Sequence, residues 1–207
     1  MGPRELLPVD VDARVRHVME LLVKEYGYRV NGAAGIVGNL IAESAVVPNR
    51  LEGSHTGTPM RARDFAGQVR DFTPEEIRNR DRAVNRGPRL PGIGIAQWTT
   101  PDRRAGLFRH AFRGQRLGTA ILFSIDAQVD YLVTELRRSY APVNATLLTL
   151  GVTVNDAADD VVYDFEVPAA VFQGRQRLPR SDPRVQAVLT ERRALAQLAL
   201  RVHQADA

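Results

Sequence analysis

The chain of 207 residues contains no cysteine, and this absence excludes disulfide bonds and thiolate nucleophiles while leaving the redox compartment open. No apolar run approaches the roughly 20 residues that a membrane-spanning helix requires. The first fifteen residues, MGPRELLPVDVDARV, lack the basic and apolar regions of a signal peptide. We therefore expect that, if the protein acts outside the cell, a separate delivery system carries it there.

Histidine is scarce, and its four copies do not form a metal-binding pattern. They lie far apart, and none belongs to a paired-ligand motif such as H-E-x-x-H. The sequence also lacks a G-x-S-x-G elbow for a serine nucleophile. Gly92-Ile93-Gly94 lacks the third glycine and the Lys-Ser/Thr of phosphate-binding loops. We therefore expect no metal, no cofactor and no nucleotide site. The histidines are His17, His55, His110 and His203.

Lysine is nearly absent, and the arginines are unevenly placed. Of the 28 basic residues only Lys24 is a lysine, and residues 61–116 hold 13 arginines against 6 acidic residues. This basic segment could attract an anionic polymer such as a cell-wall glycan or a nucleic acid, or its arginines could pair with nearby acids on solvated faces. Nucleic acid is disfavoured, because no basic run is interleaved with aromatic residues.

Hydrophobic periodicity and capping residues predict a mainly helical chain. From Thr100 onward the pattern is helical, and the first of these helices is expected to carry Leu107, Phe108, Ala111 and Phe112 inward. There is no internal repeat or low-complexity linker. The predicted helices run from Asp10 to Tyr26, Asn31 to Ser44, Thr73 to Gly87, Thr100 to Arg113, Ser124 to Ser139, Ala145 to Leu150, Asn155 to just before Pro168, and Asp182 to His203.

The stretch between Pro48 and Gly94 differs from the rest. It is rich in glycine, threonine, proline and polar residues, and predicts short strands in a hairpin-like lobe. We therefore predict a mainly α, α+β fold, with a helical domain around a buried central helix. Residues 1–207 would form a single domain, with the lobe or lid inserted at about residues 48–92.

Glu43 is the main catalytic candidate. It lies in the last turn of a predicted helix that Asn31 would cap, and apolar and small residues dominate that helix. Burial and the negative end of the helix dipole both favour the protonated carboxyl group, which is the form that a glycosidase needs in its general acid. Periodicity alone also allows an ordinary amphipathic helix whose Glu43 points into water.

The glycine-rich stretch GIGIAQWTT offers groups that suit a sugar. Gln97 has a donor and an acceptor for an amide or hydroxyl, and Trp98, the only tryptophan, has a flat apolar face on which pyranose rings could stack. A lone tryptophan is also a common core anchor, and Gln97 could equally bond to backbone.

Together these residues form a pattern that resembles the phage-tail lysozyme family, a branch of the lysozyme-like superfamily related to soluble lytic transglycosylases. The resemblance is carried by A-A-G-I-V-G-N-L-I-A-E-S-x-x-x-P-N over residues 33–49 and by G-I-A-Q-W downstream. It implies that Glu43 is the catalytic acid, that Ser44 is its hydrogen-bonding neighbour, and that the segment from Gly94 through Ile95 to Gln97 forms a glycan-binding wall.

A third stretch, Y-D-F-E-V-P from Tyr163 to Pro168, is similar to a late aromatic-Glu-x-Pro element of that family and adds Tyr163 and Glu166 as substrate-binding candidates. Its alternative is the end of an ordinary amphipathic helix. The interval from Pro48 to Gly92 is longer and richer in arginine than the family pattern leads us to expect.

The resemblance implies cleavage of the β-1,4 bond between N-acetylmuramic acid and N-acetylglucosamine in peptidoglycan. Glu52 is the first candidate for a second carboxylate that would direct water, followed by Asp64 and Asp71. Without such a partner the acetamido group of the substrate could assist, giving a 1,6-anhydro product as in lytic transglycosylases. A glycan-binding tail component without activity is a further alternative.

The expected partners are peptidoglycan strands, together with phage-tail or injection-machine proteins, and no membrane. The protein would be made in the bacterial cytoplasm and would reach the wall on a virion, through an injection apparatus or after a lysis pore opens.

Overall fold

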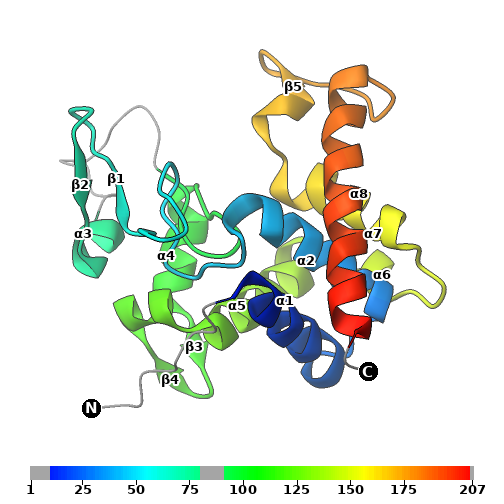
Figure 1. The fold of residues 1–207 in the computed structure, drawn as a ribbon, viewed down its shortest axis with the longest axis horizontal. Helices are drawn as coiled ribbons and strands as arrows, with labels where there is room; N and C mark the ends of the chain where they lie inside the picture. Colours follow the sequence, from blue (N-terminus) through cyan, green and yellow to red (C-terminus); the bar gives the residue numbers. More distant parts are fainter. Residues whose placement is uncertain (1–9, 80–90, 206–207) are drawn as a thin grey trace. The chain divides into compact units, whose positions relative to one another are not determined.

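A computed structural model describes residues 10–79 and 91–205 of the chain (Figure 1). Residues 43–132 form one compact unit, and residues 10–42 with residues 133–207 form another. We describe each unit by itself. In the described part of the chain no helix is long and apolar enough to cross a membrane.

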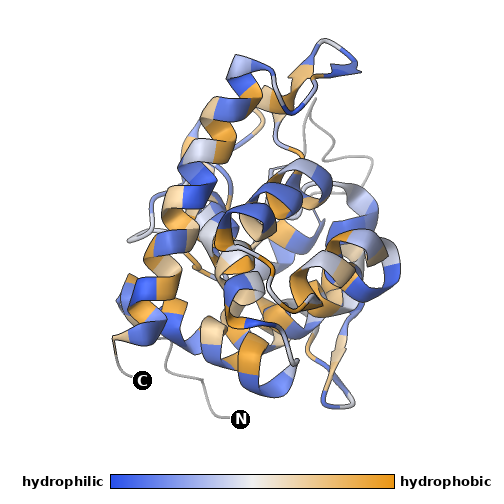
Figure 2. Ribbon diagram, turned by 90° about the vertical axis from the view of Figure 1, so that its right-hand side faces the viewer, coloured by the Kyte–Doolittle hydropathy of each residue, from blue (hydrophilic) through white to orange (hydrophobic). Residues whose placement is uncertain are grey.

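The discontinuous unit, residues 10–42 and 133–207, is built mainly from helices. The long helix α8 packs against α1 and α7 (Figure 1). Figure 2 shows hydrophobic and hydrophilic residues in alternating bands along α8, the helix that leads to the C-terminus, as expected for a helix with one buried face. The elements that begin in this unit are α1 (Val11–Glu20), η1 (Leu21–Glu25), α2 (Val30–Ser44), α6 (Ala141–Leu148), α7 (Val154–Asp160), η4 (Val161–Glu166), η5 (Ala169–Val171), β5 (Phe172–Gln173), β6 (Gln176–Arg177) and α8 (Pro183–Gln204).

Capping chemistry sets the start of two of these helices where the sequence predicts it. The Asp10 side chain accepts a hydrogen bond from the Asp12 amide at α1, and Asp182 does the same for Arg184 at α8. The first helix also ends as predicted near Gly27, at φ 77°. Its last turn, η1, is a π-helix, which the pattern did not indicate.

Glycines allow α2 to approach its neighbours closely. A Cβ at Gly32 would lie 2.1 Å from the Leu147 carbonyl oxygen, and one at Gly38 would lie 2.4 Å from the Ala196 amide nitrogen. The predicted cap at Asn31 is wrong, because α2 begins at Val30 and the amide of Ala33 bonds to the Arg29 carbonyl. Asn31 instead donates to the Val152 carbonyl at 2.9 Å.

Two other helix boundaries also differ from expectation. The helix α6 begins at Ala141, before the predicted Ala145, because Pro142 occupies its first turn, where a missing amide proton costs nothing. Thr153, and not Asn155, caps α7, and its hydroxyl accepts from the Asp156 amide at 3.0 Å. The predicted helix toward Pro168 continues from α7 as the π-helix η4.

The unit of residues 43–132 combines short helices with two hairpins. The β1–β2 pair lies in the stretch for which the sequence predicts short strands, with Arg61 opposite Asp71. A further hairpin in the described part of the chain, β5–β6, belongs to the other unit. The described residues therefore have the predicted mainly α, α+β class. The elements beginning in this unit are β1 (Arg61–Arg63), β2 (Val69–Asp71), α3 (Pro74–Asn79), α4 (Pro101–Arg109), β3 (Ala111–Phe112), β4 (Gln115–Arg116), η3 (Gly118–Phe123) and α5 (Ile125–Ser139).

The predicted helix from Thr100 to Arg113 is shorter in the structure. Thr100 caps α4 as expected, but α4 ends at Arg109 and the chain turns into the β3–β4 hairpin. Ala111 is exposed and Phe112 only partly buried, so the inward orientation predicted for them is wrong. The turn at Arg113-Gly114 has φ values of 49° and 78°, which are incompatible with a continuing right-handed helix.

The start of α3 at Thr73-Pro74 is confirmed. The Thr73 hydroxyl accepts from the Glu76 amide at 3.2 Å, while the Glu76 carboxylate accepts from the Thr73 amide at 2.8 Å, forming a capping box. The predicted end of this helix at Gly87 lies outside the described residues.

Candidate active site

Glu43 and Ser44 form the end of α2 and lie in the unit of residues 43–132. The Ser44 hydroxyl donates to the Ile95 carbonyl at 2.8 Å, and Ser44 is fully buried. Glu43 is partly exposed. The two sequence motifs, 51 residues apart at this contact, therefore meet through the residue that follows Glu43. In this arrangement Ser44 positions the end of α2 and is not accessible to a substrate.

The turn after Ser44 is strained. Ala45 and Val46 have φ values of 53° and 59°, in the left-handed region that L-residues other than glycine rarely adopt. Each such residue costs about 1–2 kcal/mol. Val46 is fully buried, so the surrounding packing holds this backbone in place.

Arg50 supports the same turn from the next segment. Its Nη1 donates to the Ser44 carbonyl at 3.4 Å, and desolvation by burial lowers the pKa of its guanidinium. Arginine remains protonated in proteins despite such a shift. Arg50 therefore provides a fixed positive charge at the C-terminal end of α2, where it offsets the negative end of the helix dipole.

The GIGIAQWTT stretch is a tight loop that glycine makes possible. Ile93 and Trp98 exchange backbone hydrogen bonds at 3.2 and 3.0 Å. Between them Gly94 has a φ of 83°, and a Cβ there would lie 2.6 Å from Gln128 Oε1 and 2.8 Å from Trp98 Cζ3. No larger residue fits at position 94 without displacing both neighbours.

Gln97 bonds to backbone, as one sequence interpretation allowed. Its Nε2 donates to the Arg50 carbonyl at 3.0 Å and to the Gly94 carbonyl at 2.9 Å. Gln97 is partly exposed, whereas Gly94 and Ile95 are buried. Of these three predicted wall residues, Gln97 is the one whose side chain reaches the surface.

Trp98 is a core residue. Its side chain has no exposed surface and packs against Tyr131 with ring centroids 5.2 Å apart. A sugar cannot stack on a face that other side chains cover, so the core-anchor alternative replaces the predicted stacking role.

Gln128 is a structural residue of this site that the sequence interpretation missed. It is fully buried, its Oε1 accepts from the Ile95 amide at 2.9 Å, and its Nε2 donates to the carbonyls of Pro48 and Ile121 at 2.7 and 2.9 Å. It thereby joins the loop at Ile95 to the segment after Glu43. Its position one turn before Leu132, on the apolar stripe of α5, could have indicated from the sequence that this glutamine is buried.

The candidate second carboxylates differ in their surroundings. Glu52 is exposed, and its Oε2 accepts from the Gly92 amide at 2.8 Å, which attaches it to the start of the glycine-rich loop. Asp64 accepts from the amides of Ala66 and Gln68 within the β1–β2 loop. Asp71 forms an ion pair with Arg61 at 2.7 Å. Asp64 and Asp71 thus stabilise the hairpin, and Glu52 is the one bonded to the loop that holds Ile95.

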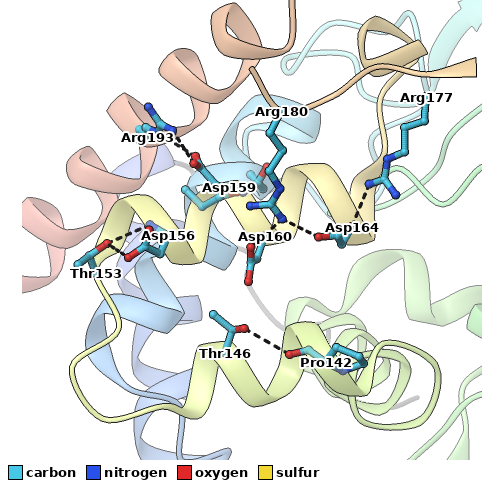
Figure 3. Close-up of polar contacts among 12 residues, drawn as sticks. Pro142, Thr146, Thr153, Asp156, Asp159, Asp160, Asp164, Arg177, Arg180 and Arg193 are labelled. Carbon is cyan, nitrogen blue, oxygen red and sulfur yellow. Dashed lines mark hydrogen bonds and ion pairs between the residues drawn. The ribbon is translucent and has the colours of Figure 1, made fainter. Parts of the chain in front are cut away.

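Tyr163 and Glu166 lie in the other unit, on η4. The Tyr163 hydroxyl donates to the Leu178 carbonyl at 2.6 Å, and the guanidinium groups of Arg177 and Arg180 lie 3.8 and 4.8 Å from its ring centroid. Figure 3 shows the same arginines reaching Asp164, to which both form ion pairs. Tyr163 therefore has a clear structural role, and its part in substrate binding stays a prediction.

Within residues 10–79 and 91–205, no group of three or more His, Cys, Asp or Glu side chains is arranged to hold a metal ion.

A family model described as phage tail lysozyme matches residues 13–199. No curated protein and no solved structure matches the chain.

Proposed function

Because this chain belongs to the phage tail lysozyme family, we propose that it cleaves the β-1,4 bond between N-acetylmuramic acid and N-acetylglucosamine with Glu43 as general acid. Membership indicates a peptidoglycan-degrading, lysozyme-like enzyme. The bond, the acid and the mechanism are our proposal. The observation that carries it is the buried Ser44–Ile95 hydrogen bond, which ties the end of α2 to the glycine-rich loop.

The geometry supports Glu43 in three respects. Glu43 is partly exposed, as contact with substrate requires. The adjacent Ser44 is fixed by its bond to Ile95, so the backbone that carries Glu43 is preorganised. The strained Ala45–Val46 turn is of the kind found near functional sites, where the surrounding structure holds the backbone against its cost.

In the hydrolytic route, Glu43 gives its proton to the glycosidic oxygen as the bond from that oxygen to the sugar carbon breaks. A carboxylate on the other side takes a proton from water while the water oxygen attacks that carbon, and the product has a reducing end. Glu52 is our first candidate for this base, because its contact with Gly92 holds it to the same loop as Ile95.

In the second route, Glu43 gives its proton to the glycosidic oxygen as that bond breaks, and the carbonyl oxygen of the substrate's acetamido group bonds to the sugar carbon. Glu43, now a carboxylate, then takes the proton from the 6-hydroxyl while the 6-oxygen bonds to the same carbon and the bond from that carbon to the acetamido oxygen breaks. The product is a 1,6-anhydro sugar, no water is consumed, and Glu52 has no catalytic role.

Replacing Glu43 with glutamine tests the assignment. The variant keeps the shape of the side chain but cannot donate the proton, so we expect release of muropeptides from purified sacculi to fall by at least about 100-fold. Glu25→Gln, at an exposed glutamate on η1, is the matched control and should keep parental activity. Equal activity of the parent and Glu43→Gln would reject Glu43 as the acid. Binding of sacculi without turnover by any of these proteins would instead indicate a glycan-binding tail component.

Replacing Glu52 with glutamine separates the two routes. A glutamine oxygen can still accept from the Gly92 amide, so the loop contact survives while the base is lost. We expect strong loss of reducing-end products, measured by mass spectrometry of the released muropeptides. Anhydro ends from both the parent and Glu52→Gln would establish the second route.

We further propose delivery to the wall by a virion tail or an injection apparatus, in keeping with the family to which the chain belongs.

A further inference from the structure

Two hairpins, one in each compact unit, share a short sequence. The first reads F-R-G-Q-R-L over residues 112–117, and the second reads F-Q-G-R-Q-R-L over residues 172–178. Both contain a phenylalanine, a glycine two residues later and a terminal Gln-Arg-Leu. The segment is too short to stand out in the chain as a repeat, but both copies fold as antiparallel pairs, β3–β4 and β5–β6.

Both hairpins are anchored at the base and exposed at the tip. Beside β3, His110 Nε2 lies 2.6 Å from Asp130 Oδ2. At the second hairpin the buried residues Val171 and Leu178 flank the strands, and the Leu178 amide donates to the Val171 carbonyl at 2.8 Å. The residues between these anchors are exposed, except Phe112, which is partly buried. Each hairpin therefore presents a short exposed finger from a fixed base.

Both tips carry an arginine, and in the first hairpin that arginine has a costly backbone conformation. Arg113 is the first central residue of its turn and has a φ of 49°, a conformation that asparagine or glycine adopts more readily. In the second hairpin Gly174 takes the position with positive φ, at 60°, and Arg175 follows it. An arginine held in the left-handed region at an exposed tip suggests that its charge is used there.

The arginines of the first hairpin differ from those of β1–β2. In β1–β2, Arg61 pairs with Asp71 at 2.7 Å and Arg70 with Glu76 at 2.9 Å. Within the described residues Arg113, Arg116 and, at the end of α4, Arg109 make no ion pair, although all three are exposed.

The second hairpin uses one arginine internally and leaves another available. Arg177 pairs with Asp164 at 3.0 Å and lies over Tyr163 (Figure 3). Arg175, at the exposed tip, has no ion pair in the described part of the chain. Each finger thus ends in positive charge that the described residues do not neutralise.

We propose that the two fingers, residues 109–116 and 172–177, bind the carboxylates of the peptide stems of peptidoglycan. This proposal rests on the proposed function. An arginine fork matches a carboxylate bidentately, and each finger by itself can bind one of the carboxylates that the stems present. The guanidinium carbon of Arg113 lies 4.9 Å from the centroid of the Phe112 ring, a contact that does not neutralise the charge of Arg113. Each finger has one phenylalanine, partly buried at Phe112 and exposed at Phe172, and a single aromatic ring per finger is a poor stacking surface for successive nucleic-acid bases.

The test is cosedimentation of the full chain with purified sacculi, using Glu43→Gln as background to slow digestion. The fingers are altered by Arg113→Asn with Arg116→Gln, and separately by Arg175→Gln. Asparagine tolerates positive φ, so the first turn should keep its fold. Arg138→Gln with Arg201→Gln removes two exposed arginines on helices and matches the charge change of the double variant. Circular dichroism verifies that every variant is folded.

We expect the variant with both Arg113→Asn and Arg116→Gln to bind sacculi roughly 5- to 30-fold more weakly than the parent. The control with two substitutions on helices should bind as the parent does. Sacculi whose stem carboxyl groups have been converted to neutral amides, with a carbodiimide and ammonia, should bind the parent as weakly as untreated sacculi bind the finger variant. Equal losses in finger and helix variants, or equal binding to untreated and amidated sacculi, would overturn the proposal. The proposal would also be overturned if binding of the parent depended on phosphate-bearing wall polymers. It would likewise be overturned if DNA, added at the same concentration of negative charge as the sacculi, displaced the protein from them.

The readouts also separate this proposal from the proposed function. If Glu43→Gln still digests the sacculi while finger variants bind weakly, Glu43 is rejected as the acid and the proposed role of the fingers is supported. If digestion depends on Glu43 and finger variants bind normally, only the proposed role of the fingers is rejected.

Discussion

At the scale of single residues, Gly94 has the most constrained position of the candidate site. We expect Gly94→Ala to lower the free energy of unfolding by roughly 2–5 kcal/mol, from the left-handed backbone and from the contacts of the new Cβ with Gln128 and Trp98. Urea unfolding followed by Trp98 fluorescence measures the change. Gly57→Ala is the control, because nothing lies within 4 Å of a Cβ there. Equal stabilities of the two variants would contradict this account of the loop.

Gln128 provides a second test at this scale. Gln128→Leu keeps the apolar volume but leaves the Ile95 amide and the carbonyls of Pro48 and Ile121 without their partner. We expect a loss of roughly 3–6 kcal/mol in the free energy of unfolding, with activity reduced in the molecules that remain folded. Gln204→Leu, at an exposed end of α8, should change stability little. A small effect at Gln128 would mean that water replaces its hydrogen bonds.

The sequence predicted which segments belong to the candidate site better than it predicted the orientation of their side chains. Glu43-Ser44 and the GIAQW motif were associated by resemblance, and the Ser44–Ile95 bond joins them in space. Burial of Trp98 depends on Tyr131, and the bonds of Gln128 depend on three distant carbonyl and amide groups. Neither follows from local periodicity, because both are set by tertiary packing.

At the scale of secondary-structure elements, the capping box of α3 should make stability depend on pH. Hydrogen bonds from Thr73 and Arg70, the backbone bond first, lower the pKa of Glu76 below its ordinary value of 4.5. A carboxyl group with a lowered folded-state pKa contributes stability above the unfolded pKa and loses it as the pH falls through the folded pKa. We expect Glu76→Gln to be less stable than the parent at pH 7, by no more than about 1 kcal/mol because the carboxylate is largely solvated. This difference should vanish in acid below the folded pKa, as measured by urea unfolding across pH.

The pair between α7 and α8 allows a stronger prediction. Arg193 binds both oxygens of Asp159 at 2.7 and 2.5 Å, and the Asp159 side chain is 11% exposed (Figure 3). Arg193→Gln leaves a mostly buried carboxylate uncompensated, so we expect a loss of roughly 2–4 kcal/mol in the free energy of unfolding. Adding Asp159→Asn should recover part of that loss. Arg61→Gln, whose ion pair with Asp71 is exposed on both sides, is the control and should cost less than about 1 kcal/mol. No recovery in the double variant would indicate that packing, and not charge, accounts for the loss.

Helix starts were predicted well where a capping side chain or a proline marks them, as at Asp10, Thr73 and Asp182. Helix ends and short hairpins were predicted less well. The end of α4 depends on positive φ at Arg113 and Gly114, and an Arg-Gly pair signals such a turn less clearly than Asn-Gly does.

At the scale of the whole molecule, two helices have residues in both compact units. Glu43 and Ser44, at the end of α2, and the first eight residues of α5 belong to residues 43–132, while the rest of each helix belongs to the other unit. We therefore expect one cooperative unfolding transition. Trp98 fluorescence reports on residues 43–132, and far-ultraviolet circular dichroism reports on helices throughout the chain. The two probes should give coincident urea transitions.

Gly38→Ala makes this prediction sharper. The new Cβ would meet the backbone of Ala196 at 2.4 Å, in the discontinuous unit, and should destabilise the chain. In a cooperative molecule the midpoint reported by Trp98 shifts with the circular dichroism midpoint, although Trp98 lies in the other unit. A Trp98 transition that does not move would show that the units unfold independently.

The left-handed turn at Ala45 and Val46 has a consequence for how this protein would respond to selection. Ala45→Gly would relieve about 1 kcal/mol of backbone strain, so a screen for heat resistance alone should enrich it. The same change would loosen the segment directly after Glu43. If the rigidity of this turn holds Glu43 in place, a screen for wall lysis should retain alanine at position 45. The two screens would then select different residues at this one position.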